Sequence, residues 1–165
     1  MLRWPHSSLP SSSSSSCWDS ELEAKGIFSR DVSGRKVAFV SKEVVDGFVE
    51  ALRKLEEDRD VEALVEIHTE DCEVGNVSVS ETFRGHDGLR EFWIEYRRTF
   101  GEMKSTFRNV FATEDGAALE WTTDGTSNGD TVSYDGASIL EIVDGKVRRF
   151  MAYFDTRDLT PQVVD

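Results

Sequence analysis

Two short turn signals divide the C-terminal half of this 165-residue chain into three long β-strand patterns. Asn128-Gly129 and Asp144-Gly145 are pairs that two-residue hairpin turns favour, because both central positions of such a turn need a positive φ. They separate the segments AALEWTTDGTS, TVSYDGASILEIV and KVRRFMAYFD. We therefore expect residues 117–155 to form an antiparallel meander, preceded by one more strand over residues 106–113.

The residues before these strands show helical periodicity. Apolar residues recur at spacings of three and four over residues 45–55, and Ser41 is placed to cap the helix that they predict. Asp60 is placed to cap a second, shorter helix, and a strand is expected over residues 72–79. The third helix has a broad apolar stripe that consists of Leu89, Phe92, Trp93, Tyr96 and Phe100. The predicted order is ααβαββββ, which is typical of an α+β layer architecture.

The composition is that of one acidic domain. The chain has 38% hydrophobic residues, enough for a single core, and a net charge of -13. This charge repels a phosphate backbone, so we expect no nucleic-acid partner. No apolar run approaches the ~20 residues that span a bilayer, so we expect no membrane association. Cys17 and Cys72 form neither a disulfide framework nor a paired metal motif, which fits a reducing, cytoplasmic compartment.

The N-terminal segment differs in kind from the rest of the chain. MLRWPHSSLPSSSSSSCWDS is a low-complexity sequence with little apolar surface to offset the entropy of ordering. We therefore expect residues 1–36 to be a disordered Ser-rich tail and residues 37–165 to be the folded domain.

The order of elements, the motif FRGHDGLREFW, the strand ALEW and the ending EIVDGKVRRFMAYFD together resemble the SnoaL-like families of the NTF2-like superfamily. The resemblance covers about residues 41–160. It implies a cone-shaped α+β barrel, in which a curved antiparallel sheet packs on three helices, with a pocket at the wide end and a homodimeric assembly. Relatives include polyketide cyclases, ketosteroid isomerases, limonene epoxide hydrolases and non-catalytic transport factors, so the fold alone does not determine the function.

Three positions of this chain correspond to catalytic residues of the ketosteroid isomerases, and none of the three has a side chain that could do the same chemistry. The carboxylate base corresponds to Asn76, the oxyanion tyrosine to Phe48 and the oxyanion aspartic acid to Ser138. An amide cannot remove a proton, and a phenylalanine has no hydroxyl to donate to an enolate. Isomerase chemistry of that type is not expected.

The hydrolases and cyclases lead to the same expectation. The Arg and the two Asp of the epoxide hydrolases correspond to Trp121, Thr123 and Ala152, and their accessory asparagine alone is retained, as Asn76. The acid/base Asp and the His of the polyketide cyclases correspond to Ala152 and Ser138. We therefore expect no recognisable catalytic set, no cofactor and no metal.

The resemblance and the strand alternation together predict the residues that line the pocket. Asn76 and Ser138 are its expected polar members, which either orient a ligand or bond to protein groups or water. The aromatic members are either pocket wall or plain core. The predicted set is Phe48, Asn76, Trp93, Tyr96, Trp121, Thr123, Ser138, Phe150, Ala152 and Phe154.

Other ionisable residues have simpler structural explanations. Asp155 lies on the strand face opposite Phe154 and suits a cap of a short terminal helix. His68 lies at a helix C-terminus, where its ring can meet free carbonyl groups. We favour this role over a metal site formed by His68 with Asp71, Cys72 and Glu73. His86, before the third helix, is a cap or a general base. Glu120 is expected on the outer sheet face, and the segment KLEEDRD is interpreted as a solvated helix end.

The sequence thus predicts a domain that binds a small, largely apolar molecule of polyketide or terpenoid type and dimerises through its outer sheet. The alternative is a cyclase-like or isomerase-like enzyme that uses a non-standard polar pocket, for example with Asn76, Ser138, Tyr96 or His86.

Overall fold

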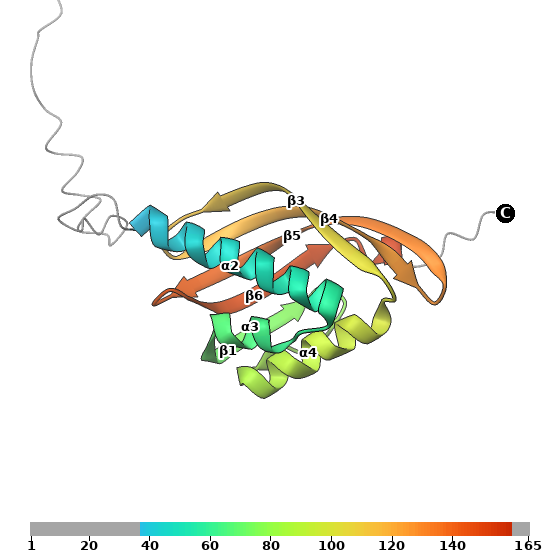
Figure 1. Ribbon diagram of the computed structural model, residues 1–165, viewed down its shortest axis with the longest axis horizontal. Coiled ribbons are helices and arrows are strands. Elements are labelled where there is room, and N and C mark those ends of the chain that lie inside the picture. The colour runs from blue at the N-terminus through green and yellow to red at the C-terminus, as the bar shows by residue number, and fades with distance from the viewer. Residues whose placement is uncertain (1–36, 160–165) are drawn as a thin grey trace, which may run out of the picture. The chain divides into compact units, whose positions relative to one another are not determined.

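The computed structural model describes residues 37–159, so the predicted tail, residues 1–36, lies outside the described residues. Figure 1 shows the elements of the described range. In chain order they are α2 (Val37–Asp58), α3 (Glu62–Ile67), β1 (His68–Asn76), β2 (Phe83–Arg84), α4 (Gly85–Thr99), β3 (Met103–Ala112), β4 (Gly116–Ser127), β5 (Asp130–Val143), β6 (Lys146–Phe154) and the 3-10 turn η1 (Thr156–Leu159). The predicted α+β class is confirmed, with the short strand β2 as an addition to the predicted order.

The strands form one curved sheet in the order β2-β1-β6-β5-β4-β3. Its C-terminal part is the predicted meander: Ser127 pairs with Asp130 across one turn, and Val143 with Lys146 across the other. Asn128 and Asp144 have φ values of 52° and 50°, as this turn type requires. Both hairpins are therefore confirmed.

The sheet is mixed, which corrects the expectation of a wholly antiparallel sheet. β1 pairs with β6 in parallel, with Val74 opposite Phe150 and Asn76 opposite Ala152. The hairpin turns determine only pairs that are adjacent in sequence. After β1 the chain passes through α4 and returns at the opposite edge as β3, so the central neighbour of β1 is the last strand of the meander.

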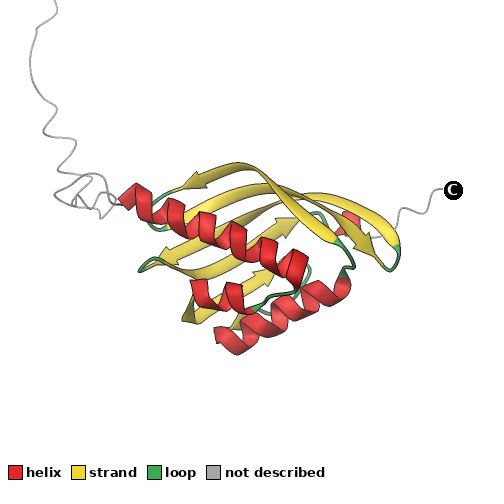
Figure 2. Cartoon of the chain, in the orientation of Figure 1, coloured by secondary structure: helices red, strands yellow, loops and turns green. Residues whose placement is uncertain are grey.

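The three helices lie against one face of the sheet (Figure 2). The predicted stripe of α2 is buried, with Phe48 at 1% and Leu55 at 0% exposure. The helix begins at Val37, so Ser41 lies within it and the prediction that Ser41 caps it is wrong. Before α3, Asp60 Oδ1 accepts a hydrogen bond of 3.3 Å from the Ala63 N–H, as its predicted capping role requires.

Side chains alternate across the strands, and this alternation determines which strand residues face the helices. On β6, Phe150 and Ala152 are buried against the helices, whereas Tyr153 is 43% exposed on the outer face. On β4, Trp121 and Thr123 point inward and Glu120, on the outer face, forms an ion pair with Arg108. The predictions for the inner face of β6 and for Glu120 are confirmed.

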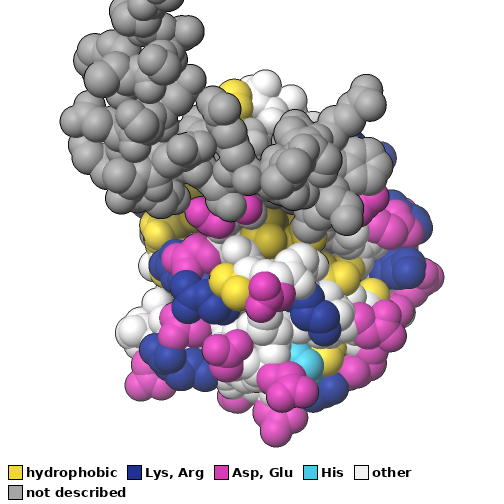
Figure 3. Space-filling model, turned by 90° about the vertical axis from the view of Figure 1, so that its left-hand side faces the viewer, with side chains coloured by type: hydrophobic (Ala, Val, Ile, Leu, Met, Phe, Trp, Pro, Cys, Tyr) yellow, Lys and Arg dark blue, Asp and Glu magenta, His cyan; other side chains and the backbone are white. Residues whose placement is uncertain are grey.

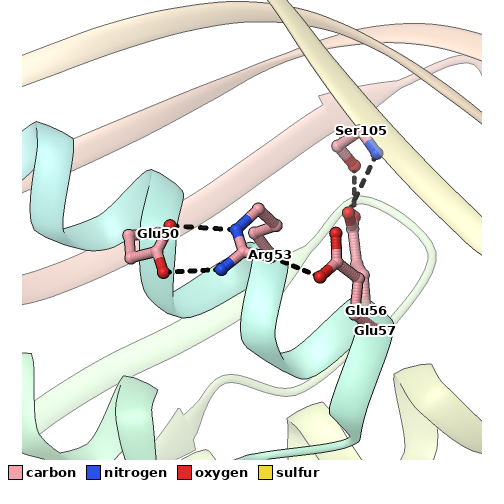
Figure 4. Close-up of polar contacts among 5 residues, drawn as sticks. All are labelled: Glu50, Arg53, Glu56, Glu57 and Ser105. Carbon is pink, nitrogen blue, oxygen red and sulfur yellow. Dashed lines mark hydrogen bonds and ion pairs between the residues drawn. The ribbon is translucent and has the colours of Figure 1, made fainter.

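Charged side chains of both signs lie interspersed on the face shown in Figure 3. Many form exposed ion pairs. Arg53, for example, pairs with Glu50 and Glu57 along α2 (Figure 4), and Arg90 joins α4 to Glu62 at 2.7 Å. Such exposed pairs contribute little to stability individually. Within residues 37–159, no helix is both long and apolar enough to cross a bilayer.

Candidate functional site

A cavity of about 160 Å³ lies between the inner face of the sheet and helix α4. Its wall is formed by residues of α4, of β1 and of β3 to β6, with Leu52 of α2 on one side. Some of its lining residues are exposed, namely Ser78, Val79, Glu95 and Thr99, whereas others, such as Phe150, are buried. The cavity is therefore open to solvent and also reaches into the core.

The structure places nine of the ten sequence-predicted residues on this wall. They are Asn76, Trp93, Tyr96, Trp121, Thr123, Ser138, Phe150, Ala152 and Phe154. Phe48 lies outside it. Its ring is fully buried in the core and stacks on Phe150, with the ring centroids 5.4 Å apart.

Aromatic residues make up ten of the 21 residues that line the cavity. Trp93 packs against Phe150 and Tyr96 with centroid distances of 5.1 and 5.3 Å. Trp121 lies directly over Gly136, where an added Cβ would come within 2.4 Å of the indole ring. The indole Nε1–H of Trp121 donates to Ser138 Oγ at 2.9 Å. The glycine and the serine together determine how this tryptophan faces the cavity.

The two expected polar residues are both held by protein groups. Ser138 is buried and accepts the hydrogen bond from Trp121. Asn76 Oδ1 accepts from the Ser78 N–H at 2.8 Å and from the Ser78 hydroxyl at 2.6 Å. Because Ser78 N–H can only donate, the bonded atom of Asn76 is its oxygen, and the amide NH₂ is the group that Asn76 retains for other partners.

A second polar group, which sequence reasoning missed, lies at the inner end of the cavity. Glu56 on α2 is 7% exposed, and its two carboxylate oxygens accept hydrogen bonds from Ser105 on β3 (Figure 4). The Ser105 N–H lies 3.0 Å from one oxygen and the Ser105 hydroxyl 2.6 Å from the other. Ser105 Oγ is also 2.8 Å from Thr123 Oγ1. Ser105 and Thr123 line the cavity, whereas Glu56 lies one hydrogen bond behind them.

Two tyrosines complete this polar end. Tyr96 and Tyr134 also line the cavity. Burial raises the pKa of Tyr134 to about 12 and that of Tyr96 well above its ordinary value of 10. Both phenols are therefore neutral at physiological pH and can donate or accept hydrogen bonds.

Burial also changes the titration of Glu56. It raises the pKa of the carboxyl above the ordinary 4.5, although the hydrogen bonds from Ser105 and the charge of Arg97 oppose this rise. The interpretation of KLEEDRD as a solvated helix end is therefore wrong for Glu56. The helical spacing contains the signal that locates it, because Glu56 lies four residues after Leu52 and eight after Phe48, on the apolar stripe.

The remaining ionisable candidates lie away from the cavity. Asp155 caps the 3-10 turn: its Oδ1 accepts from the Arg157 N–H at 3.0 Å, and hydrogen bonds from Arg157 lower its pKa to about 2. His68 is fully buried, and its Nδ1 lies 2.7 Å from the Leu64 carbonyl oxygen. The expected structural roles of Asp155 and His68 are thus confirmed. His86 is half-buried, and its Nε2 lies 3.4 Å from the His68 carbonyl oxygen.

The residues around His68 do not converge on one point. Cys72 is buried in β1, as His68 is, whereas Asp71 is exposed. Within residues 37–159, no three His, Cys, Asp or Glu side chains gather as metal ligands would.

Comparison with known proteins agrees with this fold. A family model described as "SnoaL-like domain" matches residues 45–159. No curated protein sequence matches the chain.

Solved structures with the same fold share little sequence with the chain. TerC, co-crystallised with polyporic acid, is 24% identical, with a TM-score of 0.64 over 73% of this chain and 95% of that one. A putative SnoaL-like polyketide cyclase from Jannaschia sp. CCS1 is 14% identical, with a TM-score of 0.61 over 79% and 94%. An epoxide hydrolase from M. tuberculosis, described as LEH-like, is 16% identical, with a TM-score of 0.59 over 73% and 86%.

Proposed function

Because the chain belongs to the SnoaL-like domain family, we propose that its cavity binds a small, largely apolar molecule with a polar group at one end. One observation supports this most strongly: an aromatic wall around a cavity of about 160 Å³, with the hydroxyls of Ser105 and Thr123 gathered at its inner end. Apolar walls with a few convergent polar groups are the usual composition of a small-molecule site. The fold relatives named as a cyclase, a hydrolase and a polyporic-acid complex are consistent with it.

The size of the cavity limits the ligand. An apolar cavity of about 150 Å³ is enough for one benzene ring. We therefore propose that a single ring occupies the interior, and that any longer part of a polyketide-like or terpenoid-like molecule extends towards solvent past the exposed lining residues.

A cyclase-like or isomerase-like activity is the second candidate. The buried carboxyl of Glu56, with its raised pKa, is the observation that favours it, since such groups serve as acids or bases in active sites. Glu56 does not line the cavity, however, and both of its oxygens accept from Ser105. A proton would have to move through the Ser105 hydroxyl, so we place binding first.

Binding of a single-ring probe tests the proposal. We expect p-xylene to bind with a dissociation constant below about 1 mM, equivalent to about −4 kcal/mol, in isothermal titration calorimetry. The variant Ala152→Phe, which fills the cavity from β6, should abolish this binding. The control Ala112→Phe adds the same ring at an exposed position of β3 and should bind normally. Absence of p-xylene binding to the wild type, or equal binding to both variants, would refute the proposal.

We extend the proposal to a homodimer formed through the outer sheet face. Ile139 is 36% and Tyr153 43% exposed there, on neighbouring strands β5 and β6, with Met151 paired to Ile139. Apolar side chains on an otherwise charged surface are typical of interaction sites.

Sedimentation velocity tests the assembly. The wild type should sediment as a dimer, and Tyr153→Glu should shift it to a monomer because a buried, unpaired charge at an interface costs several kcal/mol. Phe111→Glu is the control, since Phe111 is 69% exposed but lies on the edge strand β3. A monomeric wild type, or a dimer that tolerates Tyr153→Glu and dissociates with Phe111→Glu, would contradict the proposed interface.

A further inference from the structure

The contacts of Glu56 determine the direction of the hydrogen bonds at the inner end of the cavity. An ionised carboxylate only accepts, so the Ser105 hydroxyl, 2.6 Å away, donates its single proton to Glu56. Ser105 Oγ then has only lone pairs left for Thr123 Oγ1 at 2.8 Å, and Thr123 must donate. Each hydroxyl in the chain therefore directs its proton towards Glu56 and its lone pairs away from it.

The chain ends at Thr123, whose single proton is donated to Ser105 and whose lone pairs remain. These residues line the cavity, whereas Glu56 lies behind them. A ligand at this end therefore meets hydrogen-bond acceptors.

We propose that Glu56 is a positioning residue that makes the inner end of the cavity a hydrogen-bond acceptor, so that the site selects molecules with a hydroxyl donor, such as phenols and alcohols. The inference rests on the proposed binding function and specifies its ligand class. Ethers and carbonyl compounds of the same shape leave the lone pairs of the chain without a partner, and polar sites reject such analogues strongly.

Some groups around Glu56 favour its ionised form, and others oppose it. Arg97 of α4 favours the ionised carboxylate, although its own Nη1 donates to the carbonyls of Phe100 and Gly101 at 3.3 and 3.0 Å. Glu57 on the same helix and burial oppose ionisation. Tyr96 of α4 and Tyr134 of β5 face the carboxyl as neutral phenols.

Protonation of Glu56 reverses the chain. A protonated carboxyl donates to Ser105 Oγ, which then donates to Thr123, and the cavity end gains a free proton. When the pH falls below the raised pKa of Glu56, the preference for ligands that donate a hydrogen bond should therefore weaken. Ligands that only accept a hydrogen bond should then bind relatively better.

Three probes of similar shape test the inference. They are p-cresol, which donates a hydrogen bond, 4-methylanisole, which only accepts, and p-xylene, which does neither. We expect the wild type at neutral pH to bind p-cresol about tenfold more tightly than 4-methylanisole. In Glu56→Gln the amide NH₂ donates to Ser105 Oγ at every pH. The ratio of p-cresol affinity to 4-methylanisole affinity should therefore fall to about one or below. Glu66→Gln removes the same charge from an exposed position of α3 and should keep the tenfold preference.

The outcomes separate the two proposals. If p-xylene does not bind to the wild type, the binding function itself fails. If p-xylene binds but the wild type and Glu56→Gln show the same ratio of p-cresol to 4-methylanisole affinity, only the role of Glu56 is overturned. Ser105→Ala provides a second test in case Glu56→Gln does not fold. It keeps the N–H that bonds to Glu56 and removes the link to Thr123, so it should also lose the preference.

Discussion

Acidification from about pH 7.5 to pH 4 is expected to lower the free energy of unfolding by about 3 kcal/mol through His68 alone. This side chain is fully buried at the junction of α3 and β1, and its Nδ1 is paired with the Leu64 carbonyl. Its Nε2 has no hydrogen-bond partner in the part of the chain that the structure describes. Protonation would therefore place both a charge and an unpaired N–H in the core.

The direction of the pKa shift determines whether stability rises or falls with pH. Burial lowers the pKa of His68 from 6.5 to about 4, so the folded state favours the neutral ring. The associated stability is fully present above pH 6.5 and is lost as the pH falls from 6.5 through the folded-state value of about 4.

Urea unfolding at a series of pH values measures this effect. His68→Gln should remove most of the acid sensitivity, whatever its stability at neutral pH, whereas the control His86→Gln should keep it because His86 is only half-buried. Direct titration of the His68 ring by NMR gives the same information without a substitution. A ring that titrates near 6.5, or an acid sensitivity unchanged in His68→Gln, would contradict the prediction.

Gly136→Ala is expected to lower the free energy of unfolding by about 2–3 kcal/mol, because the site is already fully packed. The added Cβ would lie 2.4 Å from Trp121 Cη2 and 2.7 Å from the carbonyl oxygen of Tyr153. The indole ring must then move, which strains the wall of the cavity and breaks its hydrogen bond to Ser138. Binding of p-xylene should weaken in the same variant.

Two further variants make this prediction specific. Gly47→Ala changes a helical glycine of α2 that has open space around it, so it should stabilise the protein by up to about 1 kcal/mol. Trp121→Leu removes the ring that Gly136→Ala would strike, so the double variant should lose less stability than the sum of the two single changes. Chemical denaturation of all four proteins measures these values. Additive losses would show that the contact between Trp121 and residue 136 does not cause the destabilisation.

Much of the fold can be predicted from local sequence patterns. Asn128-Gly129 and Asp144-Gly145 predict the register of the last three strands, since a two-residue turn allows only one pairing. That register, with the alternation of side chains, then places Phe150, Ala152 and Phe154 on one face. The nine predicted wall residues depend on this chain of reasoning and on the family resemblance.

Other features depend on pairings that no local rule determines. The parallel contact of β1 with β6 joins segments that are far apart in sequence, and no turn signal marks it. Glu56 is buried because Ser105 of a distant strand supplies two donors, although its place on the apolar stripe of α2 was visible. Phe48 lies on the same stripe but one layer deeper, beneath Phe150, so helical spacing alone could not separate core from cavity wall.

NMR of the ¹⁵N-labelled protein with bound p-cresol tests the central proposal most directly. We predict intermolecular contacts from the probe methyl group to Trp93, Phe150 and Phe154, and from the ring edge beside its hydroxyl to Thr123 and Tyr134. Contacts confined to the outer-face residues Ile139 and Tyr153, or no contacts at a saturating concentration of the probe, would contradict it.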